Sequence, residues 1–240
     1  MARVLIFVGW SLVLVLAAAY HYGPGQEQLA KDDAGRLIQP AMKLAINGQH
    51  EEAAAHLTAA LEKLPKEEIQ TQFAIRLERD KEWLQGSRLP EAHDDLVTLI
   101  DEMQETDGTS ESLLNEARES LAHSKYYLTW LMRLEGRSRD EWYPEIETAR
   151  QLYTHLAETA TAASDEPKIA RFQEDLESTI RLARMDLQQL SALPLPKQCN
   201  GCCSGDCKKP GKKPGKKPGK KQPKDARGAS AGPPLDNNGS

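Results

Sequence analysis

The chain has 240 residues, of which 28% are charged and 5% are aromatic, with a net charge of −5 and four cysteines. The charge is segregated, because residues 23–196 carry a net charge of −14 and residues 197–240 carry +8. An acidic body excludes the body itself as a surface for nucleic acid or for an anionic membrane face. The length is sufficient for one helical domain with its own core, together with a tail.

An uncharged apolar segment, residues 4–20, begins directly after Arg3. A helix of this length spans about 25 Å, slightly less than the ~30 Å hydrocarbon core of a bilayer. Trp10 and Tyr20 suit the membrane interfaces, where amphipathic aromatic side chains gather. We expect residues 1–23 to form an N-terminal transmembrane helix, with Arg3 in the cytoplasm and the C-terminal domain exported to the periplasm or the cell exterior. The alternative is a cleaved signal peptide and a secreted protein, because Ala17-Ala18-Ala19 offer small residues for a cleavage site.

Residues 24–193 show the pattern of an all-α domain. Apolar residues recur at spacings of three and four, and most glycines and prolines fall where a helix should begin or end. The predicted helices span residues 26–47, 49–64, 67–85, 89–105, 109–135 and 140–162, and a last helix runs from residue 165 through Leu190. Each carries an apolar stripe on about a third of its surface, which includes Leu156 and Phe172 in the last two helices. We therefore expect α-hairpins packed as a bundle or a short solenoid.

One stretch, from Ala34 to Pro65, has the residues of a known helical repeat. Gly48 stands where a first helix should end, Ala53 is a small residue where two helices should approach, and a proline closes the unit. This pattern resembles one tetratricopeptide repeat, which is a helical hairpin of 34 residues. Pro40 departs from the pattern, and a weaker echo lies between Tyr127 and Leu156. The resemblance implies a tetratricopeptide-like helical domain, which we expect to act as an interaction module.

The body contains no sequence motif of a known catalytic or phosphate-binding site. The nearest approach to metal-ligand pairs is Glu52 with His56 and Glu119 with His123, which we interpret as solvated contacts on helix surfaces. We therefore expect neither enzymatic activity nor a cofactor. Core positions are expected for Trp142, Tyr143, Tyr126 and Tyr127, with the lining of a groove as the alternative, and surface positions for the arginines Arg76, Arg79, Arg133, Arg137 and Arg139.

The tail contains all four cysteines within nine residues, namely Cys199, Cys202, Cys203 and Cys207. Four thiolates at these spacings suit one zinc or copper ion or an iron–sulfur cluster. In an exported tail we expect disulfides instead, either within the cluster or to a second chain. The alternatives are a metal site formed by these residues and the absence of any specific role for them.

A lysine repeat with a period of four follows the cysteines, consisting of Lys208, Lys209, Lys212, Lys213, Lys216, Lys217, Lys220 and Lys221. The intervening Pro-Gly pairs oppose both helix and sheet, so we expect residues 194–240 to form a disordered tail. Its charge would attract a polyanion, either an anionic lipid or an acidic polymer of the cell envelope, and the alternative is an extension that only keeps the protein in solution. The repeat lacks aromatic residues that could stack on bases, and we expect no nucleic-acid partner.

These features predict a membrane-anchored, exported helical interaction or scaffold protein. It would bind protein partners, whose identity the sequence does not indicate, through its acidic helical body, with the basic Cys-rich tail as an auxiliary tether. The alternative is a metal- or polyanion-binding protein that acts through the tail and uses the helical domain as a stalk.

Overall fold

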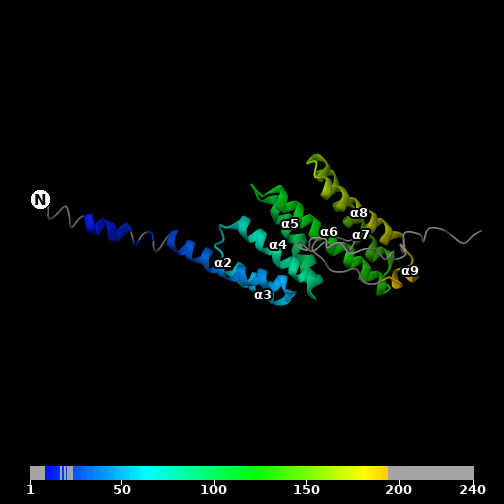
Figure 1. Cartoon of the computed structure of the whole chain (residues 1–240), viewed down its shortest axis with the longest axis horizontal. Coiled ribbons are helices and arrows are strands. Elements are labelled where there is room, and N and C mark those ends of the chain that lie inside the picture. The colour runs from blue at the N-terminus through cyan, green and yellow to red at the C-terminus, as the bar shows by residue number, and fades with distance from the viewer. Residues whose placement is uncertain (1–8, 17, 19, 21–23, 194–240) are drawn as a thin grey trace, which may run out of the picture. The chain divides into compact units, whose positions relative to one another are not determined.

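The computed structural model describes residues 9–16, 18, 20 and 24–193 of the chain. Within this described part all regular secondary structure is helical, and no strand occurs. The predicted all-α class is therefore confirmed. Helices α2 to α8 lie side by side in chain order (Figure 1).

The helices of the body are α2 (Pro24–Ile46), α3 (His50–Lys63), α4 (Ile69–Gln85), α5 (Leu89–Glu105), α6 (Glu111–Leu134), α7 (Arg139–Ala162), α8 (Glu166–Arg184) and α9 (Leu187–Ser191). From α2 to α7, each predicted boundary lies within two residues of the observed one. Local signals explain this agreement. Gly48, Gly108 and Gly136 adopt positive φ angles of 77°, 79° and 76° in the turns that follow α2, α5 and α6, a conformation that favours glycine.

The C-terminal end of the body differs from the prediction. One continuous helix was expected through Leu190, but α8 ends at Arg184 and α9 begins at Leu187. Arg133 of α6 donates hydrogen bonds to the backbone carbonyls of Leu182 and Met185, the second at 2.5 Å, so carbonyls at the end of α8 have a side-chain partner. The Asp186 carboxylate then accepts a hydrogen bond from the Gln189 amide and caps α9. The prediction of a continuous helix was wrong because this tertiary contact competes with helix continuation.

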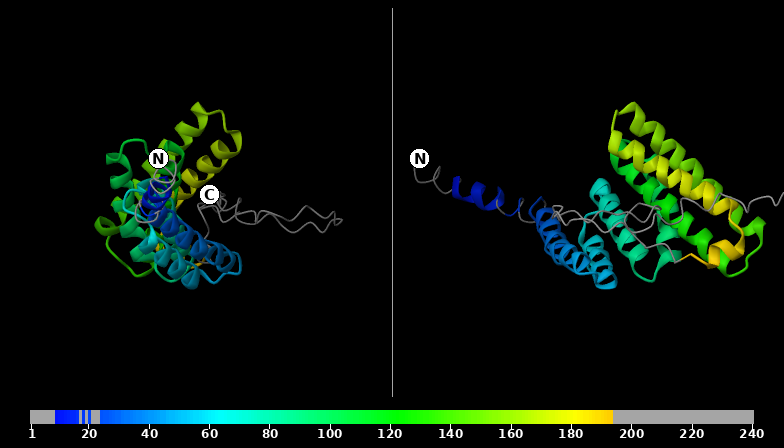
Figure 2. Two further views of the ribbon diagram at one scale, coloured as in Figure 1. Left: turned by 90° about the vertical axis from the view of Figure 1, so that its left-hand side faces the viewer. Right: turned by 45° about the vertical axis from the view of Figure 1, so that its right-hand side comes forward.

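Each helix packs mainly against its neighbours in the sequence. The contacting pairs run from α2 with α3 to α7 with α8, and α6 additionally contacts α4 and α9. Short turns join these helices, so consecutive helices form antiparallel hairpins that stack side by side (Figure 2). Such an arrangement builds a core from contacts that are close in sequence.

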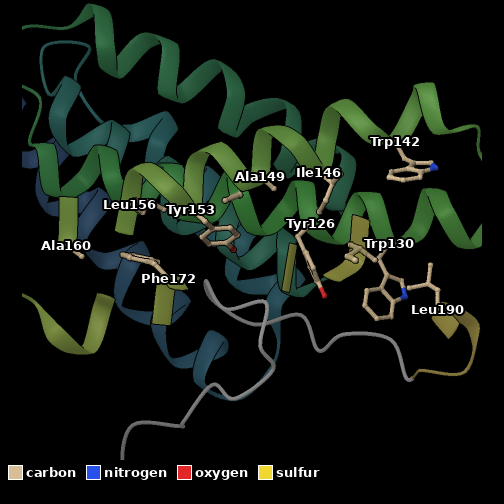
Figure 3. Close-up of a cluster of buried hydrophobic side chains, with 12 residues drawn as sticks. Tyr126, Trp130, Trp142, Ile146, Ala149, Tyr153, Leu156, Ala160, Phe172 and Leu190 are labelled. Carbon is tan, nitrogen blue, oxygen red and sulfur yellow. The ribbon is translucent and has the colours of Figure 1, made fainter. Parts of the chain in front are cut away.

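Three clusters of buried apolar side chains hold the stack together. The first lies among α2, α3 and α4 and contains Ala41, Leu57 and Ile75. The second lies among α4, α5 and α6 and includes Leu77, Leu96 and Met103. The third lies among α6, α7, α8 and α9, and Figure 3 shows its aromatic and aliphatic side chains; it includes Tyr126, Trp130, Trp142, Ile146, Tyr153, Leu156, Phe172, Leu182 and Leu190. Tyr126 and Trp142 are buried, which confirms the core positions predicted for them, and Tyr127 is partly buried against the second cluster. The core position predicted for Tyr143 was wrong, because its side chain is 39% exposed. It follows the inward-facing Trp142 on α7, and successive residues of a helix point about 100° apart.

The predicted transmembrane segment, residues 4–20, lies only partly within the described residues. Residues 9–16 are helical, and large apolar side chains there, such as Trp10 and Leu14, are exposed. Among the described residues, no helix combines the length and the apolar character that crossing a bilayer requires. The predicted tail, residues 194–240, lies wholly outside the described residues.

Candidate binding cleft

A cleft of about 570 Å³ is lined by side chains of α6, α7 and α8, together with Lys81 of α4. Its apolar lining includes Leu156, Ala160 and Phe172, which are 2%, 5% and 4% exposed and belong to the third core cluster. Figure 3 shows these three side chains gathered at one end of that cluster. The cleft therefore reaches down to the apolar core of the C-terminal half.

The walls of the cleft carry charges in matched pairs. Arg171 of α8 contacts Glu119 of α6 at 2.8 Å, and Lys81 contacts Glu116 at 2.5 Å. Lys168 contacts Asp165 at 3.2 Å near the start of α8. Because each cation lining the cleft faces a carboxylate, the charged lining is balanced. An apolar floor with a balanced polar rim suits an amphipathic ligand better than a simple ion.

Glu119 is the most perturbed acid in this cleft. Its side chain is 14% exposed, and burial raises its pKa to about 7, with Asp175 and Glu116 acting in the same direction and Arg171 acting against them. Burial disfavours the charged carboxylate, which explains the sign of the shift. Glu119 therefore changes its protonation near neutral pH, so that its carboxyl group can either donate or accept a hydrogen bond.

The pairing of Glu119 with His123 is not a solvated surface contact, contrary to the expectation. His123 is 2% exposed, and its burial lowers its pKa to about 4, so the imidazole is neutral at pH 7. The physical reason is that α6 packs between α5 and α7 and also contacts α4 and α9. Spacing along one helix does not reveal how many neighbours cover it.

The arginines of α4 and α6 also differ from the expected surface charges. The side chains of Arg76 and Arg79 are 19% and 11% exposed, and Arg133 is buried, with its guanidinium 4.6 Å from the centre of the Trp142 ring. Arg79 donates to Asp80 at 2.9 Å and to Asp95 of α5 at 2.5 Å. These arginines serve as tertiary contacts between helices.

The two neighbours of Asp80 on α4 face other helices. Lys81 contacts Glu116 of α6, and the Glu82 carboxylate lies 2.7 Å from His50 Nδ1 of α3. Asp80 itself is fully buried, and burial raises its pKa to about 8, with the nearby Asp95 acting in the same direction. Three consecutive charged residues of α4 thus connect it to three different helices, α5, α6 and α3.

The predicted ligand sites of the tail lie outside the described residues. These are the metal or disulfide residues Cys199, Cys202, Cys203 and Cys207 and the polyanion-binding lysines from Lys208 to Lys221. Between residues 24 and 193, and in the described positions before them, no three His, Cys, Asp or Glu side chains are grouped so that they could hold a metal ion.

The cleft itself was missed from the sequence. Phe172 and Leu156 were identified as stripe residues, but Glu119 and Arg171 are 52 positions apart, and no local pattern links them. A usable signal is the presence of small or polar residues, such as Thr159 and Ala160 in the last turn of α7 and Ala163 directly after it. Such residues leave space between neighbouring helices.

Comparison with known proteins gives no match to a family model, to a curated protein or to a solved structure. The tetratricopeptide resemblance of residues 34–65 therefore stays a prediction. These residues form the end of α2, the turn and all of α3, with Gly48 in the turn at positive φ and Ala53 fully buried. Both features are those that the resemblance implies for a helical hairpin.

Proposed function

We propose that this chain is a membrane-anchored, exported interaction protein whose cleft among α6, α7 and α8 binds a segment of a partner protein. The observation that carries the proposal is the apolar floor of Leu156, Ala160 and Phe172 below the balanced charges of the walls. A volume of about 570 Å³ falls within the ~300–1,000 Å³ range of ligand sites in proteins. An amphipathic partner segment covers the floor with apolar side chains and meets the walls with polar groups.

The membrane anchor and the tail complete this proposal from the sequence. The uncharged run of residues 4–20 after Arg3 supports an anchor with the body on the exported side, and cleavage after a signal peptide is the alternative. The net charge of +8 in residues 197–240 supports an auxiliary tether to an anionic lipid or envelope polymer. N-terminal sequencing of the mature protein distinguishes the membrane anchor from the cleaved signal peptide, because a mature chain that starts near Tyr20 has been cleaved.

The test of the cleft is capture of partners from the native membrane by the full chain and by a variant in which the cleft is filled. Thr159 lines the cleft, so Thr159→Trp should reduce the amount of the captured partner at least tenfold. Thr161→Trp is the matched control, because Thr161 is an exposed residue of the same helix that does not line the cleft. Equal capture by both variants contradicts binding in the cleft.

A tail-centred function gives the opposite result in a second variant. Deletion of residues 197–240 should leave partner capture unchanged if the cleft binds the partner. Loss of capture in this deletion, with full capture by Thr159→Trp, would instead support a metal- or polyanion-binding protein that acts through its tail.

A further inference from the structure

A second groove, of about 410 Å³, lies between the start of α4 and the end of α5. We call it the α4–α5 groove, and its lining includes Ile69, Phe73, Arg76, Glu102 and Glu105. None of these residues lines the cleft among α6, α7 and α8. The two sites can therefore be altered independently.

The floor of the α4–α5 groove is formed by two apolar side chains, of which only Ile69 is exposed. Ile69, the first residue of α4, is 42% exposed, and Phe73 lies one turn further along the helix with 4% exposure. An aliphatic side chain placed on Ile69 would remove apolar surface from water. The groove thus offers a contact for the hydrocarbon part of a ligand.

The rim of the groove has an excess of negative charge. The sequence contains no Lys or Arg between Arg88 and Arg118, whereas nine Asp or Glu residues lie in that interval. Arg76 pairs with Glu102 across the groove. Within the described part of the chain, the exposed carboxylate of Glu105, which lines the groove, forms no ion pair. Asp101 and Asp107 are also exposed and form no ion pair there, and they lie near Glu105 in the sequence but do not line the groove.

These carboxylates lie at a helix end where acids are unfavourable. The C-terminus of a helix carries partial negative charge and favours basic side chains. The last turn of α5 contains no basic residue and ends on Glu105. An incoming cation would relieve the repulsion from both the carbonyls and the carboxylates.

We propose that the α4–α5 groove binds a lysine side chain in a basic segment of a partner protein. The four-carbon stem of the lysine lies on Ile69, and its ammonium group reaches Glu105, since Glu102 already pairs with Arg76. Long basic side chains commonly bury their stems in this way while their charge stays at a polar edge. This inference adds a second binding surface and does not depend on occupancy of the cleft among α6, α7 and α8.

The test uses the full chain in detergent micelles and a fluorescein-labelled hexalysine peptide, with binding followed by fluorescence anisotropy. Glu105→Lys should weaken hexalysine binding at least fivefold. Glu158→Lys is the matched control, because it makes the same change of charge at an exposed residue of α7 outside the groove, and it should weaken binding less than twofold. Circular dichroism verifies that both variants keep their helical content.

Four results would overturn the inference. Equal weakening by Glu105→Lys and Glu158→Lys would show a diffuse attraction to the acidic body. Unchanged hexalysine affinity in Ile69→Ser would show that the apolar floor takes no part, and hexaglutamate binding as tight as hexalysine would exclude charge recognition. A change in sedimentation coefficient with concentration that Glu105→Lys abolishes would assign the groove to a second copy of the chain.

Discussion

The two ends of the helix stack are held by cores of different composition. At the α2–α3 end the cluster of buried apolar residues consists of Ala41, Leu57 and Ile75. At the α6–α9 end the buried cluster contains five aromatic side chains, including Tyr153 and Trp130. A buried aromatic side chain removes roughly 150–250 Å² of surface from water, so the second core contributes more to stability for each helix. The stack is therefore expected to open first at α2 and α3.

This difference bears on where binding takes place. The cleft among α6, α7 and α8 rests directly on the aromatic core through Phe172 and Leu156. A site on a well-packed support keeps its geometry with little loss of conformational freedom on binding. The outer side of α2, in contrast, leaves Met42 and Ile46 58% and 85% exposed.

The largest expected effect is in the aromatic core. Leu182 is fully buried, and Leu182→Ala leaves a cavity between α8 and its neighbours. We expect a loss of about 3–5 kcal/mol in the free energy of unfolding, typical of a buried leucine whose surroundings cannot collapse. Urea denaturation followed by circular dichroism at pH 7 measures it. A loss below about 1 kcal/mol would contradict the view that the α6–α9 core is the more rigid of the two, because a rigid core cannot collapse into the cavity that the substitution leaves.

A matched substitution in the smaller core should cost less. Leu57 is 5% exposed and is surrounded by Ala41, Ile75 and three partly buried residues. We expect Leu57→Ala to lose about 2 kcal/mol, at the low end for such changes. Hydrogen exchange should accelerate in α2 and α3 while α7 and α8 stay protected. Met42→Ala, at an exposed position, should leave exchange unchanged, and faster exchange across all helices would contradict independent opening of this end.

The third effect is a dependence of the free energy of unfolding on pH, which arises from Glu119 in the C-terminal half. Because the pKa of Glu119 is raised to about 7 from a reference value of 4.5, the folded state binds more protons than the unfolded state between these values. The contribution of Glu119 to stability is therefore present below about pH 4.5 and is lost as the pH rises to about 7. Between pH 5 and 8, Glu119→Gln should reduce this decline by about 1–3 kcal/mol. Urea denaturation at each pH measures it.

The control for this series is Glu174→Gln, which changes an exposed residue of α8 and should leave the pH dependence of stability as it is.

The titration of His123 changes stability in the opposite direction, at lower pH. Since burial lowers its pKa from 6.5 to about 4, its contribution to stability is present above pH 6.5 and is lost as the pH falls toward 4. Identical pH profiles for the wild type and Glu119→Gln would show that Glu119 is not buried as described.

Most of the helix boundaries could be predicted because they depend on local signals. Gly48 and Gly136 mark turns whose backbone needs positive φ, and Pro90 and Pro167 stand in the first turns of α5 and α8. The break after Arg184 could not be predicted from the apolar stripe, which continues in phase through Leu187 and Leu190. It depends on hydrogen bonds from Arg133, which is far away in sequence.

The candidate site could be predicted far less well than the fold. Apolar periodicity identifies Leu156 and Phe172 as inward-facing residues, and the structure confirms both. Periodicity gives no information about Glu119 or His123, because their burial depends on neighbours supplied by distant segments. From the sequence of a single helix, a charged residue is predicted to be solvated. It is buried only when a second or third helix covers it.

Three consecutive charged residues at the centre of α4 limit where the chain can accept insertions and deletions. Asp80, Lys81 and Glu82 meet α5, α6 and α3, respectively, by way of Arg79 and Asp95, Glu116 and His50. An α-helix turns about 100° per residue, so one residue inserted before Arg79 redirects all three side chains at once. We therefore expect insertions and deletions to be tolerated in the turns between hairpins, where only chain length changes, and to be incompatible with folding inside α4.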